Sequence, residues 1–296
     1  MNPPLPTAPK TGVPAAERFP GSAPARFLTR LADAWIGAGW HTMLAAAGLA
    51  ADAGLRFGFP ARETIAFAAL NGGGALALYG GRYVLRMISG GDGDRENAIR
   101  RVPAFAGFSC LAGLAVCVAG ALALPAVFWL WETLCGIAAL AYCYPLLGRP
   151  WREYGALKPV LLALCWTAVT CGPPGPAGYA TVVAARAVWL TGLALAFDIK
   201  DIDKDRAQGV LTPAVRRGEQ GIWPLVLALL AAGLLAKLAV VPAALRGPTS
   251  IAWAVSLLML AKIRRSRSTR DWVVWGDGMM IVYALVPVAA WILAGG

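Results

Sequence analysis

Long apolar stretches, separated by short polar segments, follow one another along almost the whole chain. Several of them approach the ~20 residues that an α-helix needs to cross the hydrocarbon core of a bilayer. Polar residues gather between the stretches, as expected for loops at two membrane surfaces. The pattern predicts about nine membrane-spanning helices. Their predicted ranges are 30–50, 63–88, 103–121, 125–146, 157–174, 180–197, 222–242, 249–263 and 272–294.

The composition agrees with this pattern. Hydrophobic residues make up 58% of the chain, charged residues only 15%, and the mean hydropathy is +0.60. These values exclude an ordinary soluble protein and indicate an all-α integral membrane protein. Residues 1–27 are rich in Pro, Ala and Gly, so we expect a disordered cytoplasmic tail there. Residues 28–296 are predicted to form a polytopic helical membrane domain.

The net charge of +11 is unevenly distributed over the predicted loops. Basic side chains concentrate in every second loop, whereas the other loops keep only Arg56, Arg62 and Arg246. The positive-inside rule therefore predicts a cytoplasmic N-terminus, and we expect a multi-pass protein of a bacterial inner membrane. A basic inner rim also attracts membrane lipid and diphosphate-bearing substrates. No soluble basic module with base-stacking aromatic residues is evident, which argues against nucleic-acid binding.

The strongest candidate for chemistry is an acidic string that follows the apolar stretch ending at Phe197. Asp198, Asp201 and Asp205 stand at i, i+3 and i+7, so a helix that continues through them places all three on one face. Asp203 falls off that face. Convergent carboxylates repel one another unless a cation lies between them, and hard oxygen ligands select Mg²⁺ or Ca²⁺. The alternative is a solvated acidic helix end.

This string resembles the second Asp-rich motif of the UbiA-type intramembrane prenyltransferases. The segment GVLTPAVRRG over 209–218 is similar to the family's Gly-x-x-Thr-x-Pro segment, with the proline one place early. The resemblance covers most of residues 28–296. Weaker matches are YPLL from Tyr144, Leu157-Lys158, WTAVT from Trp166 and Asp277-Gly278.

The resemblance implies a helical bundle around a central cavity that opens to the cytoplasmic side. In that family, two Asp-rich motifs hold Mg²⁺ ions that bind an isoprenoid diphosphate, and an acceptor captures the carbocation that ionisation produces. Carried over by position, Asp198, Asp201 and Asp205 are the catalytic Mg²⁺ ligands. Lys158 is a candidate diphosphate contact, or else a lysine that snorkels to the interface. Asp277, which opens the last predicted span, is a further candidate for substrate binding.

The first Asp-rich motif of the family is replaced in this chain. At its expected place, the end of the second predicted span, Arg82 and Arg86 stand at i and i+4 on one helix face. A second registration of the motif starts at Asn71, which makes this residue a candidate substrate contact. Its position beside Gly72–Gly74 also suits close helix packing with a hydrogen bond to a neighbouring helix.

A third registration uses Asp92, Asp94, Glu96 and Asn97, just past the predicted helix end. Three consequences compete. Arg82 and Arg86 could grip the diphosphate directly, since guanidinium suits phosphate oxygens. Asp92, Asp94 and Glu96 could restore a second metal site from a loop. Alternatively, the two arginines could pair with the carboxylates of the second motif and leave a family member that binds lipid without chemistry. The sequence leaves these hypotheses open.

The interpretation that best fits the sequence is an integral membrane enzyme that ionises an isoprenoid diphosphate with Mg²⁺ and transfers the prenyl group to an unknown acceptor. A terpene cyclase that uses the same ionisation step, a non-catalytic lipid-binding member and a transporter are the alternatives. A zinc site or a histidine triad is not expected, because the chain has one histidine and six scattered cysteines. The histidine, His41, is expected to be packed or interfacial.

Overall fold

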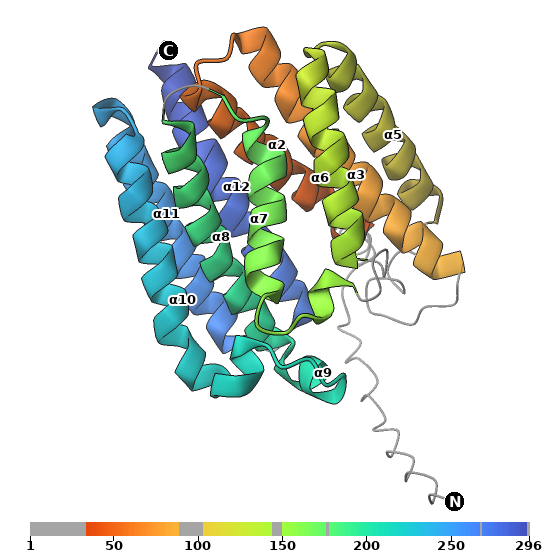
Figure 1. The fold of residues 1–296 in the computed structure, drawn as a ribbon, viewed down its shortest axis with the longest axis vertical. Helices are drawn as coiled ribbons and strands as arrows, with labels where there is room; N and C mark the ends of the chain where they lie inside the picture. Colours follow the sequence, from red (N-terminus) through yellow and green to blue (C-terminus); the bar gives the residue numbers. More distant parts are fainter. Residues whose placement is uncertain (1–33, 89–102, 144–149, 176–177, 267, 295–296) are drawn as a thin grey trace, which may run out of the picture.

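The computed structural model describes residues 34–88, 103–143, 150–175, 178–266 and 268–294. Within these ranges every regular element is a helix, and the helices pack side by side in one bundle (Figure 1). The predicted tail over 1–27 lies outside the described residues, as do Asp92 and Asp94. The elements are α2 (Trp40–Arg56), α3 (Ala61–Ile88), α5 (Pro103–Leu122), α6 (Ala126–Cys143), η1 (Trp151–Glu153), α7 (Lys158–Cys171), α8 (Tyr179–Lys200), α9 (Ile202–Ala207), α10 (Pro213–Val240), α11 (Ala243–Arg265) and α12 (Thr269–Leu293).

Five of the described helices, α5, α8, α10, α11 and α12, are long and apolar enough to cross a membrane. Two shorter apolar helices, α6 and α7, lie beside them. These helices support the predicted all-α, multi-pass membrane protein. The count of nine spans, the orientation and the central cytoplasmic cavity stay predictions.

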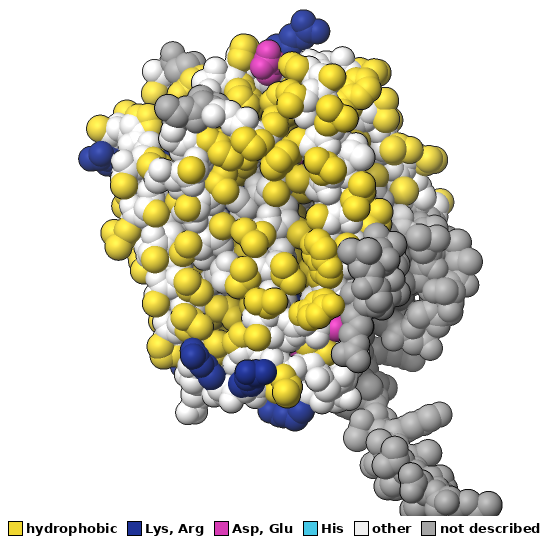
Figure 2. Space-filling model, viewed as in Figure 1, with side chains coloured by type: hydrophobic (Ala, Val, Ile, Leu, Met, Phe, Trp, Pro, Cys, Tyr) yellow, Lys and Arg dark blue, Asp and Glu magenta, His cyan; other side chains and the backbone are white. Residues whose placement is uncertain are grey.

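The surface of the bundle is apolar between its two ends. Figure 2 shows hydrophobic side chains over the body of the molecule and Lys and Arg side chains near its ends. Leu111, Leu130 and Leu258 are among the large apolar side chains that are mostly exposed. A soluble monomer rarely exposes so continuous an apolar surface, whereas contact with lipid tails requires one.

The largest core cluster joins α8, α10 and α12. Trp189 of α8 stacks on Tyr283 of α12, with ring centroids 4.0 Å apart. Gly233 of α10 makes room for this pair, because a Cβ there would stand 2.6 Å from the Cβ of Trp189. The C-terminal half of α8 therefore lies deep in the bundle, and it carries the first aspartate of the acidic string.

Glycines let α3 and α5 approach almost backbone to backbone. A Cβ added to Gly73 would overlap the backbone nitrogen of Cys117, and one added to Gly113 would stand 2.6 Å from the nitrogen of Ala77. Small residues at a helix crossing permit such close contact. The predicted packing role of the glycines around Asn71 is confirmed.

Replacing Gly73 by alanine is expected to lower the stability of the bundle by about 1–3 kcal/mol, because the added methyl group overlaps the facing backbone. The matched control is Gly74→Ala, whose Cβ would meet only the Cys117 sulfur at 3.7 Å. Unfolding of both variants in the same detergent measures the difference. Equal stabilities would contradict the close α3–α5 crossing.

Candidate functional site

The acidic string lies at the end of the bundle where α8 turns into α9, here called the α9 end (Figure 1). α8 ends at Lys200, and Asp201 stands between the two helices with φ −94° and ψ 6°. The chain therefore bends at Asp201 instead of continuing as one straight helix. After α9, Thr212 caps α10 by accepting a hydrogen bond from the Val215 amide. Asp205 of α9 contacts Lys158 at the start of α7.

Lys158, the first residue of α7, bridges two aspartates of the string. Its Nζ lies 3.0 Å from Oδ1 of Asp198 and 2.7 Å from Oδ2 of Asp205. Both carboxylates are buried, and the lysine side chain is mostly buried as well. The structure thus brings together three of the residues that the sequence singled out, from α7, α8 and α9. We call them the lysine–aspartate cluster.

The lysine–aspartate cluster carries an excess of negative charge. One ammonium group faces two carboxylates, which leaves a formal charge of −1. In addition, Oδ2 of Asp198 is buried and has no hydrogen-bond partner in the described part of the chain. A buried carboxylate oxygen without a partner is costly. The cluster therefore has the capacity to accept one more donor or cation.

The third aspartate of the predicted face lies apart from this cluster. The Asp201 side chain is 34% exposed, and its Oδ1 lies 3.9 Å from Nζ of Lys200. Asp203 points away from the bundle, as the helical spacing predicts, and its side chain is 97% exposed. The bend at Asp201 explains why the prediction of three aspartates on one face is only partly right.

The described residues can be tested against the Mg²⁺ that the resemblance implies. Within the ranges that the structure describes, no three His, Cys, Asp or Glu side chains are close enough to hold a metal ion together. Mg²⁺, however, is commonly bound by one or two carboxylates together with substrate phosphates. Asp198 and Asp205 supply such a pair of hard oxygen donors, and Asp198 has a free oxygen. The donor set therefore fits Mg²⁺ that arrives with a diphosphate.

Asp277, the candidate on α12, pairs with a residue that the sequence reasoning set aside. Its Oδ2 lies 2.7 Å from Nε2 of His41 and accepts a hydrogen bond from Oγ1 of Thr42 at 3.2 Å. His41 is buried at the start of α2, and its Nδ1 has no partner among the described residues. The sequence offered two signals, a single histidine inside the first predicted span and an aspartate near the start of the last. A sequence separation of 235 residues concealed the contact between α2 and Asp277.

Gly276 allows the segment that carries Asp277 to pack closely against the segment that carries Asp198. A Cβ at Gly276 would overlap the ring of Phe197, the residue before Asp198. The Asp277 segment of α12 therefore lies against the Asp198 segment of α8.

Asn71 lies within α3, and its side chain contacts α3 itself and α6. Its Nδ2 donates to the carbonyl oxygen of Phe67, and its side chain interacts with Glu132 of α6. Roughly 25 Å of helix separates Asn71 from Ile88, the last residue of α3. The side chains of Arg82 and Arg86 lie outside the described residues, although their backbone belongs to α3.

Comparison with known proteins gives one informative result. No family model and no curated protein matches the chain. Among solved structures, the apo structure of a UbiA homolog from Aeropyrum pernix K1 matches with a TM-score of 0.60 and 18% identity, over 87% of this chain and 99% of that one. The chain has the fold of a UbiA homolog. The predicted resemblance to UbiA-type proteins is thereby confirmed at the level of the fold, and the assignment of the motifs stays a prediction.

Proposed function

We propose that this chain is an integral membrane prenyltransferase of the UbiA type. It would ionise an isoprenoid diphosphate with Mg²⁺ and transfer the prenyl group to an acceptor. The observation that carries the proposal is the lysine–aspartate cluster, buried at one end of a UbiA-like bundle.

The charge of the cluster favours a binding site over a structural ion pair. A purely structural cluster is stable when its charges balance and every buried polar atom has a partner. Here the formal charge is −1, and one carboxylate oxygen of Asp198 is unpartnered among the described residues. A divalent cation held by Asp198 and Asp205 would satisfy that oxygen.

Lys158 would contact the diphosphate. An ammonium group has three N–H donors and a flexible stem, so it can hold a phosphate oxygen while it stays close to the carboxylates. Mg²⁺, when bound, would neutralise the charge that develops on the leaving diphosphate. The apolar interior of the bundle would shield the allylic carbocation from water.

His41 and Asp277 would handle the proton that the acceptor loses. When neutral His41 carries its proton on Nε2, the Nε2–H donates a hydrogen bond to Asp277. The lone pair of the imidazole then lies on Nδ1, which has no partner in the described ranges. Asp277 would hold that tautomer. The contact between Gly276 and Phe197 brings this pair to the level of Asp198, where the acceptor would lie.

The direct test uses the purified protein with farnesyl or geranylgeranyl diphosphate, Mg²⁺ and membrane lipid extract as the source of acceptor, and measures diphosphate release. We expect release that EDTA abolishes and that Asp198→Asn reduces about tenfold to hundredfold, the range for losing one charge-assisted contact. The exposed Asp203→Asn is the matched control and should release diphosphate like the unmodified protein. Absence of release from both donors, or equal loss in both variants, would overturn the proposal.

Product analysis separates transfer from cyclisation. A terpene cyclase would convert the diphosphate to a hydrocarbon or alcohol without any added acceptor, because the same ionisation step is followed by intramolecular capture. A transferase would form its product only when an acceptor is present. Mass spectrometry of the extracted products with and without membrane lipid extract distinguishes the two reactions.

A further inference from the structure

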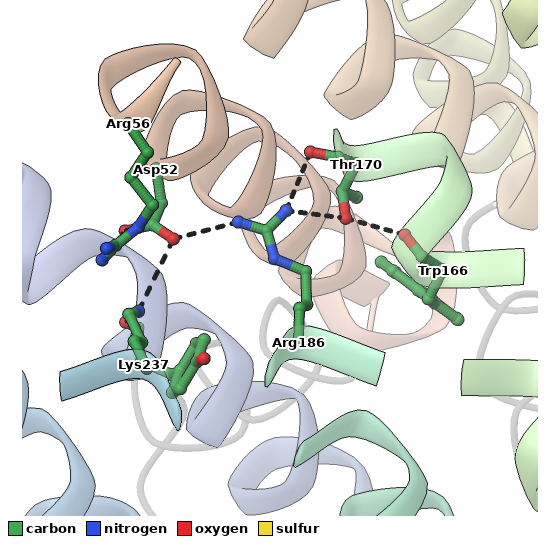
Figure 3. A network of polar contacts seen from close by, with 7 residues as sticks. Asp52, Arg56, Trp166, Thr170, Arg186 and Lys237 are labelled. Carbon is green, nitrogen blue, oxygen red and sulfur yellow. Dashed lines mark hydrogen bonds and ion pairs between the residues drawn. The ribbon is translucent and has the colours of Figure 1, made fainter. Parts of the chain in front are cut away.

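A second charged cluster lies at the end of the bundle opposite the α9 end. Asp52 of α2 is contacted by three basic side chains, from α2, α8 and α10 (Figure 3). Its Oδ1 accepts hydrogen bonds from Nε and Nη2 of Arg56, at 3.0 and 2.8 Å. Its Oδ2 lies 2.9 Å from Nη2 of Arg186 and 3.5 Å from Nζ of Lys237. We call these four residues the Asp52 cluster.

Main-chain carbonyl groups complete the contacts of two of these cations. Nη1 of Arg186 donates to the carbonyl oxygen of Thr170 in the last turn of α7, where helix carbonyls have no helical partner. Lys237 donates to the carbonyl oxygen of Tyr283. Pro287 stands four residues after Tyr283 and has no N–H, so that carbonyl is free to accept from the lysine. The cations are thus fixed by the helices around them.

The Asp52 cluster has more positive charge than it can neutralise. With Lys237 protonated, three cations face one carboxylate and the formal charge is +2. With Lys237 neutral, the formal charge is still +1. All four side chains are at most 7% exposed. Buried charges are stable when they are paired, so this cluster lacks an anion among the residues that the structure describes.

A cavity of about 210 Å³ lies directly beside the cluster. Arg56 lines it, and Nη1 of this arginine is buried and has no hydrogen-bond partner in the described ranges. Asp52 is the remaining charged group in the lining, and the other lining side chains are apolar. The apolar lining includes Phe57, Val182, Val240, Leu245, Val288 and Trp291.

We propose that this cavity binds the anionic group of an amphiphile, a phosphate or a carboxylate attached to an apolar chain. The free N–H groups of Arg56 would bind the anion, since guanidinium donates to two oxygens at once. The apolar walls would contact the methylene groups next to it. The cavity is smaller than the roughly 300–1,000 Å³ of pockets that enclose drug-sized ligands, so it fits a head group and not a whole lipid.

The site is independent of the proposed transferase chemistry. Arg186 precedes Asp198 by about three turns of α8, which separates the two clusters by roughly 18 Å along the helix. Binding is therefore measured directly, without any assay of turnover. The probes are phosphatidylglycerol, phosphatidylcholine with the same acyl chains, and inorganic phosphate, each titrated against the full chain in an uncharged detergent with native mass spectrometry as readout.

We expect phosphatidylglycerol to bind and phosphatidylcholine to bind at least about tenfold more weakly, since its head group carries a compensating cation. Arg56→Gln should weaken phosphatidylglycerol binding by about tenfold or more. Arg246→Gln, an exposed arginine on α11 at the same end, is the control for general surface charge and should bind like the unmodified protein. Competition by inorganic phosphate would identify the charged group as sufficient, and lack of competition would identify the apolar chain as required.

Val182→Phe tests the same site with every charge intact. Val182 lines the cavity, so the larger side chain should fill it and abolish binding even if Arg56→Gln fails to fold. The inference is overturned if no anionic probe binds, or if binding to Val182→Phe and to the unmodified protein is equal.

Discussion

Lys158→Met is expected to produce both a less stable protein and the loss of diphosphate release. Removing the ammonium leaves the carboxylates of Asp198 and Asp205 buried against each other with no cation between them. Removing one partner of a buried ion pair typically costs about 3–5 kcal/mol. Loss of the diphosphate contact should lower the release rate by about tenfold to hundredfold. Thermal unfolding and diphosphate release, measured on the same preparation, check the two effects.

A triple variant separates the two effects. Lys158→Met combined with Asp198→Asn and Asp205→Asn replaces all three charges and leaves no carboxylate stranded. We expect its thermal stability to recover most of the loss, while its rate of diphosphate release stays at least as low as that of Lys158→Met. If the single variant is as stable as the unmodified protein, the ion contacts of the cluster are wrong. If the triple variant releases diphosphate as fast as the unmodified protein, the chemistry takes place elsewhere.

The helical framework could be predicted because a bilayer dictates it. Apolar stretches of about 20 residues have one stable conformation in lipid, so the predicted range 180–197 coincides with α8 over most of its length. The predicted range 222–242 misses the first turns of α10. The charged residues Arg216, Arg217 and Glu219 mask the helix there, and Gly218, with φ 70°, kinks it. Hydropathy therefore misplaces the end of a helix when that helix extends beyond the apolar layer of the membrane.

Residue spacing alone predicted the candidate site only where its residues are close in sequence, whereas Lys158, 47 residues from Asp205, became a candidate through the family resemblance. Asp198 and Asp205 share a motif, and their spacing already suggested convergence. The bend at Asp201 could not be anticipated, because helical spacing assumes a continuous helix. The contact between His41 and Asp277 depends on how α2 packs against α12, which no local pattern encodes.

The Asp52 cluster illustrates the same limit more sharply. Asp52 lies just past the predicted span 30–50, and Arg186 and Lys237 lie within the predicted spans 180–197 and 222–242, so the hydropathy pattern singles out none of the three. Their contacts cross a sequence separation of 134 residues between Asp52 and Arg186, and they depend on three helices meeting at one depth. An acidic residue inside an apolar helix is nevertheless a signal, because such a residue requires a partner.

Asp52→Asn is expected to be among the most destabilising single substitutions in the chain. The amide is similar in size, so packing changes little, but three basic side chains lose the one carboxylate that faces them. We expect a loss of about 3–5 kcal/mol, the cost of leaving buried charges without a partner. The exposed Asp203→Asn is the matched control and should change stability by less than about 0.5 kcal/mol.

Removing one of the cations should then compensate in part. When Asp52→Asn is combined with Lys237→Met, two basic side chains face the new amide instead of three, so the double variant should be more stable than Asp52→Asn alone. Such non-additivity is the mark of residues that interact directly. Thermal unfolding of the two single variants and the double variant in one detergent completes the cycle. Strictly additive losses would mean that Lys237 does not interact with Asp52. The cluster would then consist of Arg56, Arg186 and Asp52, with a formal charge of +1 beside the cavity.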